Sequence, residues 1–416
     1  MAASFRRKAR EWRAWCHRRL HGRTRWIAIT GSVGKTTTAR LVAAVLGTQG
    51  PLVDGAVVSL PNSGQLACRT ILAVRRRHRC AVLELSAHAG TASLERSIAI
   101  LRPDVAIITA VGGDHRKTFG SLAATARAKG AAVRGLRPGG TAILNADAPL
   151  VWGLRDGLTA RVLGFGRSPE AALRLEAASA RWPGHLTLTV RHGDAVEQVR
   201  TRLLGLSATV PVLAALAAGL AEGLTLAAAA RALEAVEPVE GRMSPTLTPD
   251  GITFVDNAWK SPLHIVPGSL AFLREAAAPR KVVVFGAVSD FAGGSGIRYR
   301  GLAREALAVA DIVVFSGSWG ATVAKVEAPP GKLLLIFEST AATEAGLRPL
   351  LRPGDLVLLQ GSCRMDHFER IVFDRIAPVS CWSSSCRRIQ RCRDCAKLYA
   401  PAAAPGAGGR RLAGEA

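Results

Sequence analysis

The chain has 416 residues, of which 49% are hydrophobic, so a single ordinary core is excluded and two or three folded domains are expected. The formal net charge is +24. This charge favours anionic partners such as nucleotides, acidic polymers, nucleic acid or a membrane surface, and an arginine- and alanine-rich composition explains it equally well.

Residues 1–25 form a basic segment in which Phe5, Trp12, Cys16 and Leu20 can share one helix face among arginines. This arrangement suits an anionic membrane surface or an acidic polymer. A solvated basic arm that packs loosely on the body is an equally good interpretation. The N-terminus lacks the apolar region of a secretion signal, so we expect a cytoplasmic protein, with peripheral association at the inner membrane face as an alternative.

From residue 26 onward, short apolar runs alternate with helical stretches, a pattern typical of α/β folds with buried parallel strands. Strands are predicted at 26–30, 80–85, 105–109 and 141–146. Alternating residues at 186–190 predict a small antiparallel addition within 172–202. The uncharged run 203–221 contains Pro211 and mostly small residues, so we expect a buried helix there rather than a membrane span. A further helix is expected from 226 to near Pro238.

A second series of apolar runs begins after Gly241, at 252–257, 281–287, 311–317, 332–337 and 355–362. It predicts a second α/β domain of Rossmann-like, nucleotide-binding type. The last residues, 400–416, are of low complexity and are expected to be disordered.

The stretch IAITGSVGKTTT, residues 27–38, carries the most specific motif. A strand, a glycine turn and a helix N-terminus together form a phosphate cradle, in which backbone N–H groups and a lysine face the anion. We therefore predict that the P-loop binds ATP through Gly31, Ser32, Val33, Gly34, Lys35, Thr36 and Thr37. A hydroxyl at Thr36 and an acid at the end of the strand 80–85, Glu84, are oxygen ligands of the kind that Mg²⁺ requires.

Several further motifs follow in the order found in the Mur ligase superfamily, whose members join a carboxylate to an amine with ATP. After TGSVGKTTT and LEL come RPDVAIITAVGGDHRKTFGSLAATARAKG, LNAD and EGRM. The chain most resembles the branch that adds D-Ala-D-Ala to the muramyl tripeptide. The resemblance covers roughly residues 26–370 and is strongest before Gly241.

The resemblance implies a division of the chain and roles for individual residues. It implies a P-loop ATPase domain with a parallel central sheet (26–241) and a C-terminal Rossmann-like ligase domain (242–375), and composition adds a basic segment (1–25), a four-cysteine cluster (376–399) and a tail (400–416). Catalytic roles fall to Lys35, His115, Lys129 and Arg242, with His115 and a carbamylated Lys129 also binding Mg²⁺. Contacts to ATP are expected from Asn145, Asp256 and Lys260.

The sequence departs from this family at several places. The N-terminal domain that binds a UDP-sugar has no counterpart among these residues, as in folylpolyglutamate, poly-γ-glutamate and cyanophycin synthetases. Pro211 stands where the family places an adenine-binding Asn, and residues 256–262 read DNAWKSP where the family has DDxYNANP. We therefore expect a divergent carboxylate and amine, either of a cell-wall or a poly-amino-acid type.

The C-terminal stretch 381–395 reads CWSSSCRRIQRCRDC and holds four of the eight cysteines. Four thiolates within so short a stretch suit a structural zinc ion or an iron–sulfur cluster. Free or redox-paired thiols are the alternative. The candidate ligands are Cys381, Cys386, Cys392 and Cys395.

Two other functions compete with an ADP-forming amide ligase. One is a P-loop ATPase that binds an acidic polymer without ligation. The other is a nucleic-acid-binding protein that uses the basic arm and the cysteines, for which we find no second supporting feature. The ordered presence of Glu84, His115, Lys129 and Arg242 favours the ligase.

Overall fold

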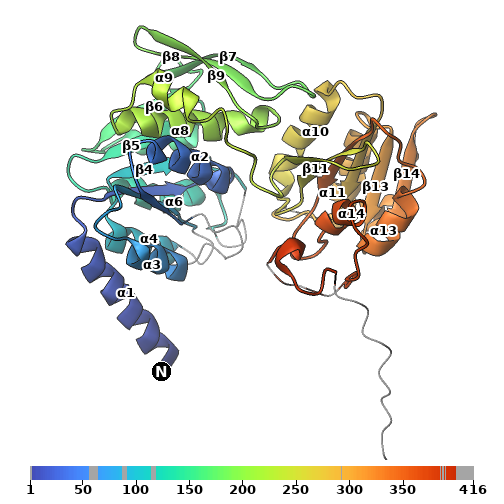
Figure 1. Ribbon diagram of the computed structural model, residues 1–416, viewed down its shortest axis with the longest axis horizontal. Coiled ribbons are helices and arrows are strands. Elements are labelled where there is room, and N and C mark those ends of the chain that lie inside the picture. Colours follow the sequence, from blue (N-terminus) through green and yellow to red (C-terminus); the bar gives the residue numbers. More distant parts are fainter. Residues whose placement is uncertain are drawn as a thin grey trace, which may run out of the picture.

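The computed structural model describes residues 2–55, 64–86, 91–113, 119–291, 293–384, 386, 388 and 390–399. Figure 1 shows two lobes, each built on its own sheet, with a long N-terminal helix against the first lobe and the C-terminal segment against the second. The predicted mixed α/β architecture is confirmed. No helix among the described residues is long and apolar enough to cross a membrane.

The first sheet has nine strands in the order β2-β3-β1-β4-β5-β6-β7-β8-β9. The strands from β2 to β7 run parallel, while β7, β8 and β9 form the antiparallel addition expected at 172–202. Their bounds are β1 Arg25–Thr30, β2 Leu52–Asp54, β3 Cys80–Glu84, β4 Val105–Ile108, β5 Thr141–Asn145, β6 Arg161–Gly166, β7 Leu173–Ser179, β8 Thr187–His192 and β9 Ala195–Arg200.

Helices cover both faces of this sheet because alternate residues of its buried strands point to opposite sides. In β1, Ile27 and Ile29 pack in the core beneath α2 and α8, whereas Trp26 and Ala28 pack in the core beneath α3 and α4. The run at 203–221 is confirmed as a buried helix. The helices of this lobe are α2 Lys35–Gly47, α3 Gly64–Ala73, α4 Thr91–Leu101, α6 Leu122–Arg134, α7 Pro149–Trp152, α8 Thr209–Ala221 and α9 Leu226–Arg231.

Helix α9 is shorter than the sequence predicts, since it ends at Arg231 rather than near Pro238. Beyond it the chain continues in turns with i→i+3 hydrogen bonds, from Leu233 to Ala230 and from Val236 to Leu233. The residue before a proline is driven towards an extended conformation, so Pro238 prevents this series of turns from continuing through Glu237.

The second sheet has six strands in the order β10-β11-β15-β12-β13-β14, all parallel except β10. The strands are β10 Ser244–Leu247, β11 Thr253–Asn257, β12 Lys281–Phe285, β13 Ile312–Ser316, β14 Leu333–Phe337 and β15 Leu356–Gln360. Five of these were predicted; β10 was not. The helices of this lobe are α10 Val266–Glu275, α11 Ser295–Leu307, α12 Gly320–Val323, α13 Thr340–Leu347 and α14 Glu369–Asp374.

Helix α1 (Ala2–Leu20) packs against α3 and α4 through one side only. The buried Arg18 guanidinium donates to the carbonyl of Leu101 at 2.6 Å and lies 3.8 Å from the carboxylate of Asp104. Phe5, Trp12 and Leu20 are exposed. The predicted basic segment is therefore a helix that is docked at its C-terminal end and presents large apolar side chains to solvent.

Candidate active site between the two sheets

The P-loop joins β1 to α2, and glycines give it its shape. Gly34 has φ 79° and immediately precedes α2, a left-handed conformation that other residues adopt only with strain. A Cβ at Gly31 would lie 2.0 Å from the Oγ1 of Thr109, which itself donates to the Val33 carbonyl at 2.6 Å. The loop is thus held against the end of β4, and its N–H groups lie at the start of a helix.

Lys35 and Thr36 occupy the first turn of α2. The Lys35 Nζ donates to the carbonyls of Gly31 at 2.8 Å and Ser32 at 3.3 Å, so it lies across the loop. The Thr36 hydroxyl donates to Glu84 Oε2 at 2.8 Å, and both side chains are buried. Two hard oxygen ligands therefore meet beside the loop, as magnesium requires.

A cavity of about 400 Å³ opens in front of this loop, and both lobes line it. Part of its wall is apolar and is formed by Leu203, Leu204, Val210, Pro211 and Met243. Its cationic side chains come from three separate segments: Lys35, Arg242 and Lys260. A volume in the range of small-molecule sites, with one apolar wall and convergent cations, suits a nucleoside triphosphate.

Arg242 follows the connection between the lobes. Burial lowers the pKa of its guanidinium, and the Glu84 carboxylate of the first lobe acts in the opposite direction. Its Nε is buried and has no hydrogen-bond partner among the described residues. A half-buried cation with one buried, unsatisfied donor, which lines the same cavity as the phosphate loop, is well placed for an anion. Lys260, also predicted, forms an ion pair of 3.0 Å with Asp290.

Not all of the predicted residues line this cavity. Lys129 is in α6 and is only 1% exposed. Asn145 ends β5, where its side-chain oxygen accepts the N–H of Asp147 at 3.0 Å and shapes a turn. His115 lies outside the described residues. The roles given to these three residues remain predictions.

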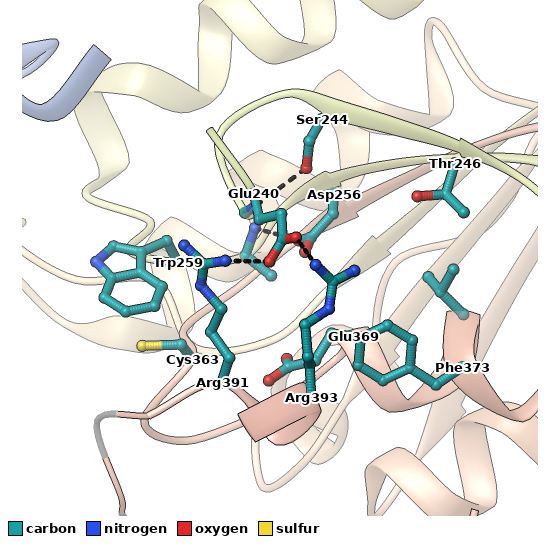
Figure 2. Close-up of a pocket in the computed structure, with 13 residues that line it drawn as sticks. Glu240, Ser244, Thr246, Asp256, Trp259, Cys363, Glu369, Phe373, Arg391 and Arg393 are labelled. Carbon is teal, nitrogen blue, oxygen red and sulfur yellow. Dashed lines mark hydrogen bonds and ion pairs between the residues drawn. The ribbon is translucent and has the colours of Figure 1, made fainter. Parts of the chain in front are cut away.

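Asp256 was predicted to contact the nucleotide, but it lines a second, smaller cavity of about 60 Å³. Figure 2 shows this cavity, where the Glu240 carboxylate lies between Arg391 and Arg393 with Asp256 beside it. Burial raises the pKa of Asp256 to about 7, and the carboxylates of Glu369 and Glu240 act in the same direction. The two cavities share Gly241 and Trp259 as lining residues, so they adjoin.

Sequence reasoning missed most of this second cavity. Glu240, Glu369, Arg391 and Arg393 come from the connection between the lobes, from α14 and from the cysteine-rich segment. The EGRM motif contains Glu240, but no local pattern indicates that two arginines 151 and 153 residues later would pair with it.

The four C-terminal cysteines surround a third cavity, together with His367 and Arg370. All eight cysteines of the chain are free thiols. Within the part of the chain that the structure describes, one group of metal-binding side chains gathers within 4.8 Å: His367, Glu369 and Cys392. The structure thus brings the predicted cysteines to one place and adds a histidine that the sequence analysis did not consider.

Comparison with known proteins identifies the family. Residues 29–219 match the model of the Mur ligase middle domain. Over 364 residues the chain is 29% identical to the UDP-N-acetylmuramoyl-tripeptide–D-alanyl-D-alanine ligase of Mycobacterium bovis, and the match covers 81% of this chain and 70% of that protein. The chain is a member of the Mur ligase superfamily.

Other Mur ligases extend the match. The UDP-N-acetylmuramate–L-alanine ligase of Salinispora arenicola is 30% identical over 373 residues, covering 81% of this chain and 66% of its own. The fold resembles MurF from Acinetobacter baumannii, with a TM-score of 0.77 at 21% identity, covering 89% of this chain and 80% of that one. It also resembles MurF from Thermotoga maritima in complex with ADP, with a TM-score of 0.73 at 19% identity. This match covers 89% of this chain and 82% of that one. The resemblance to this superfamily stated from the motifs is therefore confirmed.

Proposed function

We propose that this Mur ligase joins a carboxylate to an amine at the expense of ATP, with release of ADP and phosphate. The observation that carries the proposal is the composition of the 400 Å³ cavity, where a P-loop of the first lobe faces Arg242 and Lys260 of the second. A nucleotide between the lobes would have its phosphates in contact with both, so that closure of the lobes assembles the site.

The reaction has two steps. The substrate carboxylate attacks the γ-phosphorus of ATP, the bond to the β-phosphate oxygen breaks, and ADP leaves. The amine then attacks the acyl carbon of the acyl phosphate, loses a proton, and phosphate departs from the tetrahedral intermediate. Negative charge on the transferring phosphoryl group is the main obstacle, so positioning and electrostatic stabilisation do most of the work.

The described side chains divide these tasks. The amides of 31–37 and Lys35 hold the β- and γ-phosphates, and Arg242 contacts them from the other lobe. The apolar wall that includes Pro211 takes the base in place of an Asn. Thr36 and Glu84 would hold Mg²⁺, since their oxygens already meet at 2.8 Å. When bound there, Mg²⁺ neutralises phosphate charge.

We also propose that Lys129 carries a carbamate. Its ammonium group would first lose a proton; the neutral Nζ would then attack the carbon of CO2 and lose a second proton, which turns a cation into an anion able to bind a second Mg²⁺ with His115. The support is the family position of this lysine and its burial to 1% exposure in α6. Ligation should then depend on bicarbonate, and the Lys129→Ala variant should be inactive whether or not bicarbonate is present.

The substrates that we propose follow the relatives. The mycobacterial relative is named for adding D-alanyl-D-alanine to a muramoyl tripeptide, and the Salinispora relative for adding L-alanine to a muramate. We propose a carboxylate of a cell-wall peptide or a poly-amino-acid chain, and an amino acid or dipeptide as the amine. Residues 256–262 line both adjoining cavities, and they differ from the family pattern on the amine side.

The test is phosphate release from ATP with Mg²⁺ and bicarbonate, over a grid of carboxylates and amines that includes muramyl peptides, glutamate polymers and amino acids. Release that needs one carboxylate and one amine together, and that is lost in Lys129→Ala, establishes the ligase and names its substrates. Release that ignores every pair and persists in that variant would leave an ATPase driven by a binding partner.

We further propose that α1 docks the enzyme on an anionic lipid surface. Its C-terminal end is held by Arg18, while Phe5, Trp12 and Leu20 are 75%, 66% and 79% exposed among arginines. Apolar side chains flanked by basic ones bind at bilayer interfaces.

The test of this lipid docking is co-sedimentation with phosphatidylglycerol vesicles, with phosphatidylcholine vesicles for comparison. Trp12→Glu should weaken binding at least tenfold and Ile297→Glu should not; equal binding by both variants would contradict the proposal.

A further inference from the structure

The cavity beneath α14 has an unusual lining. Its wall is formed by all four C-terminal cysteines and by His367, with Arg370 at its side. The enclosed space is about 20 Å³, which is close to the volume of a single water-sized particle. Four thiols and an imidazole around a space for one ion have the composition of a metal site.

His367 provides an independent indication of a ligand. Its side chain is 2% exposed, and its Nε2 is buried without a hydrogen-bond partner among the described residues. Its Nδ1 lies 3.5 Å from Glu369 Oε1 and 3.5 Å from the Sγ of Cys392. With the proton on Nδ1 facing the Glu369 carboxylate, Nε2 presents a lone pair. A carboxylate behind the second nitrogen is the usual support of a metal-binding histidine.

The backbone around the cavity is fixed by one buried arginine. Arg370 is 1% exposed and donates to the carbonyls of Asp366, His367, Cys381 and Ser383, at 3.1–3.2 Å. These contacts join the turn that carries His367 to the segment that carries Cys381. The walls of the cavity are therefore held together by contacts that do not depend on an ion.

We propose that this cavity binds one Zn²⁺ ion and that His367 is one of its four ligands, beside three thiolates of the cysteine cluster. Zinc accepts tetrahedral sets of sulfur and nitrogen, including three cysteines and one histidine. Cys392 is assigned as one of the three because its Sγ lies within 4.8 Å of ligand atoms of His367 and Glu369. Glu369 is a positioning residue, which orients the imidazole and does not bind the ion.

The ion would also shape the neighbouring cavity. Cys392 lies between Arg391 and Arg393, the two residues that pair with Glu240 beside Asp256 (Figure 2). The Cys392 backbone N–H donates to Glu369 Oε1 at 3.1 Å. A zinc ion on Cys392 would therefore fix the arginines that close the second cavity. The zinc site itself does not depend on the ligase proposal, since it is measured without substrates.

The experiment measures metal in the full chain, purified from cells grown with both zinc and iron. Elemental analysis should give one zinc per chain for the unaltered protein and for Cys16→Ser, whose cysteine lies on α1. In Cys392→Ser and His367→Gln the zinc content should fall at least tenfold. Glu369→Gln should bind zinc 10- to 100-fold more weakly, as expected for loss of the support behind a ligand.

A cobalt-substituted protein tests the histidine directly. The visible spectrum should show three thiolates and one nitrogen, and His367→Gln should change it. A second measurement avoids variants that fail to fold: titration of the thiols of the native protein with a mercurial should release zinc in step with their modification. A protein without zinc, an iron–sulfur absorbance, zinc unaffected by Cys392→Ser, or a four-sulfur spectrum unchanged in His367→Gln would each overturn the proposal.

Discussion

The P-loop cavity and the cavity of Figure 2 adjoin, yet they are built in different ways. The phosphate-binding loop comes from one short stretch, and its shape is set by glycine geometry and by the contact of Gly31 with Thr109. The second cavity joins Glu240 of the connection between the lobes to Arg391 and Arg393 of the cysteine-rich segment. A change in the first should alter chemistry and leave the fold intact, whereas a change in the second should alter stability and lobe geometry together.

The largest expected effect comes from the first region. Lys35→Ala removes the cation that faces the phosphates, and we expect kcat for ligation to fall about 10²- to 10³-fold, the usual loss when one preorganised charge is removed. Coupled detection of ADP measures it. The matched control is Lys325→Ala, an exposed lysine in the second lobe. If Lys35→Ala kept full activity, or unfolded, the contrast between the two regions would fail.

A pH effect of intermediate size belongs to the second region. Folding raises the pKa of Asp256 from 3.8 to about 7, chiefly through burial. Between these values the unfolded chain has released a proton that the folded chain keeps, so the free energy of unfolding falls as pH rises through this window. Above about pH 7 the Asp256 carboxyl is ionised in both the folded and the unfolded state, so the free energy of unfolding has fallen by its full amount.

Asp256→Asn should remove this slope. Between pH 5 and 8 the unaltered protein should lose about 1–3 kcal/mol more stability than the variant, a range set below the full pKa difference because the side chain keeps some exposure to solvent. Urea unfolding at a series of pH values measures it. Asp194→Asn, at an exposed hairpin turn, should follow the unaltered protein. Parallel slopes for all three proteins would show that Asp256 ionises normally.

The same contrast explains what the sequence could predict. The apolar runs predicted most of the parallel strands because most of these strands are buried, while the partly exposed β14 was predicted because its residues are all apolar. The P-loop followed from contiguous residues such as Gly34 and Lys35. Strands β2, β6 and β10 were missed because they are short, partly exposed or mixed in polarity, whereas β7 and β9 lie in the antiparallel addition that was predicted at 172–202 without bounds for each strand. The pairing of Glu240 with two arginines, and the place of His367 among the cysteines, depend on tertiary contacts between distant segments.

The smallest expected effect concerns the ion pairs that close the second cavity. Glu240→Gln removes the charge that Arg391 and Arg393 share, but all three side chains are partly exposed, at 36%, 24% and 56%. Partly exposed pairs contribute little because water screens them and ordering long side chains costs entropy, so we expect a loss of about 0.5–1 kcal/mol that shrinks in 1 M salt.

Urea unfolding at low and high salt measures this loss, and Glu237→Gln is the control. Glu237 lies three residues before Glu240 in the same connection and lines neither cavity. It forms an ion pair with Arg202, and the side chains of Glu237 and Arg202 are 63% and 53% exposed. The two variants should differ more in function than in stability. Glu240 lies two residues before Arg242, which lines the nucleotide cavity. Loss of the Glu240 ion pairs should therefore make Arg242 less well positioned and raise the KM for ATP, whereas Glu237→Gln should not. An unchanged KM in both would show that the cysteine-rich segment does not act on the nucleotide site through this connection.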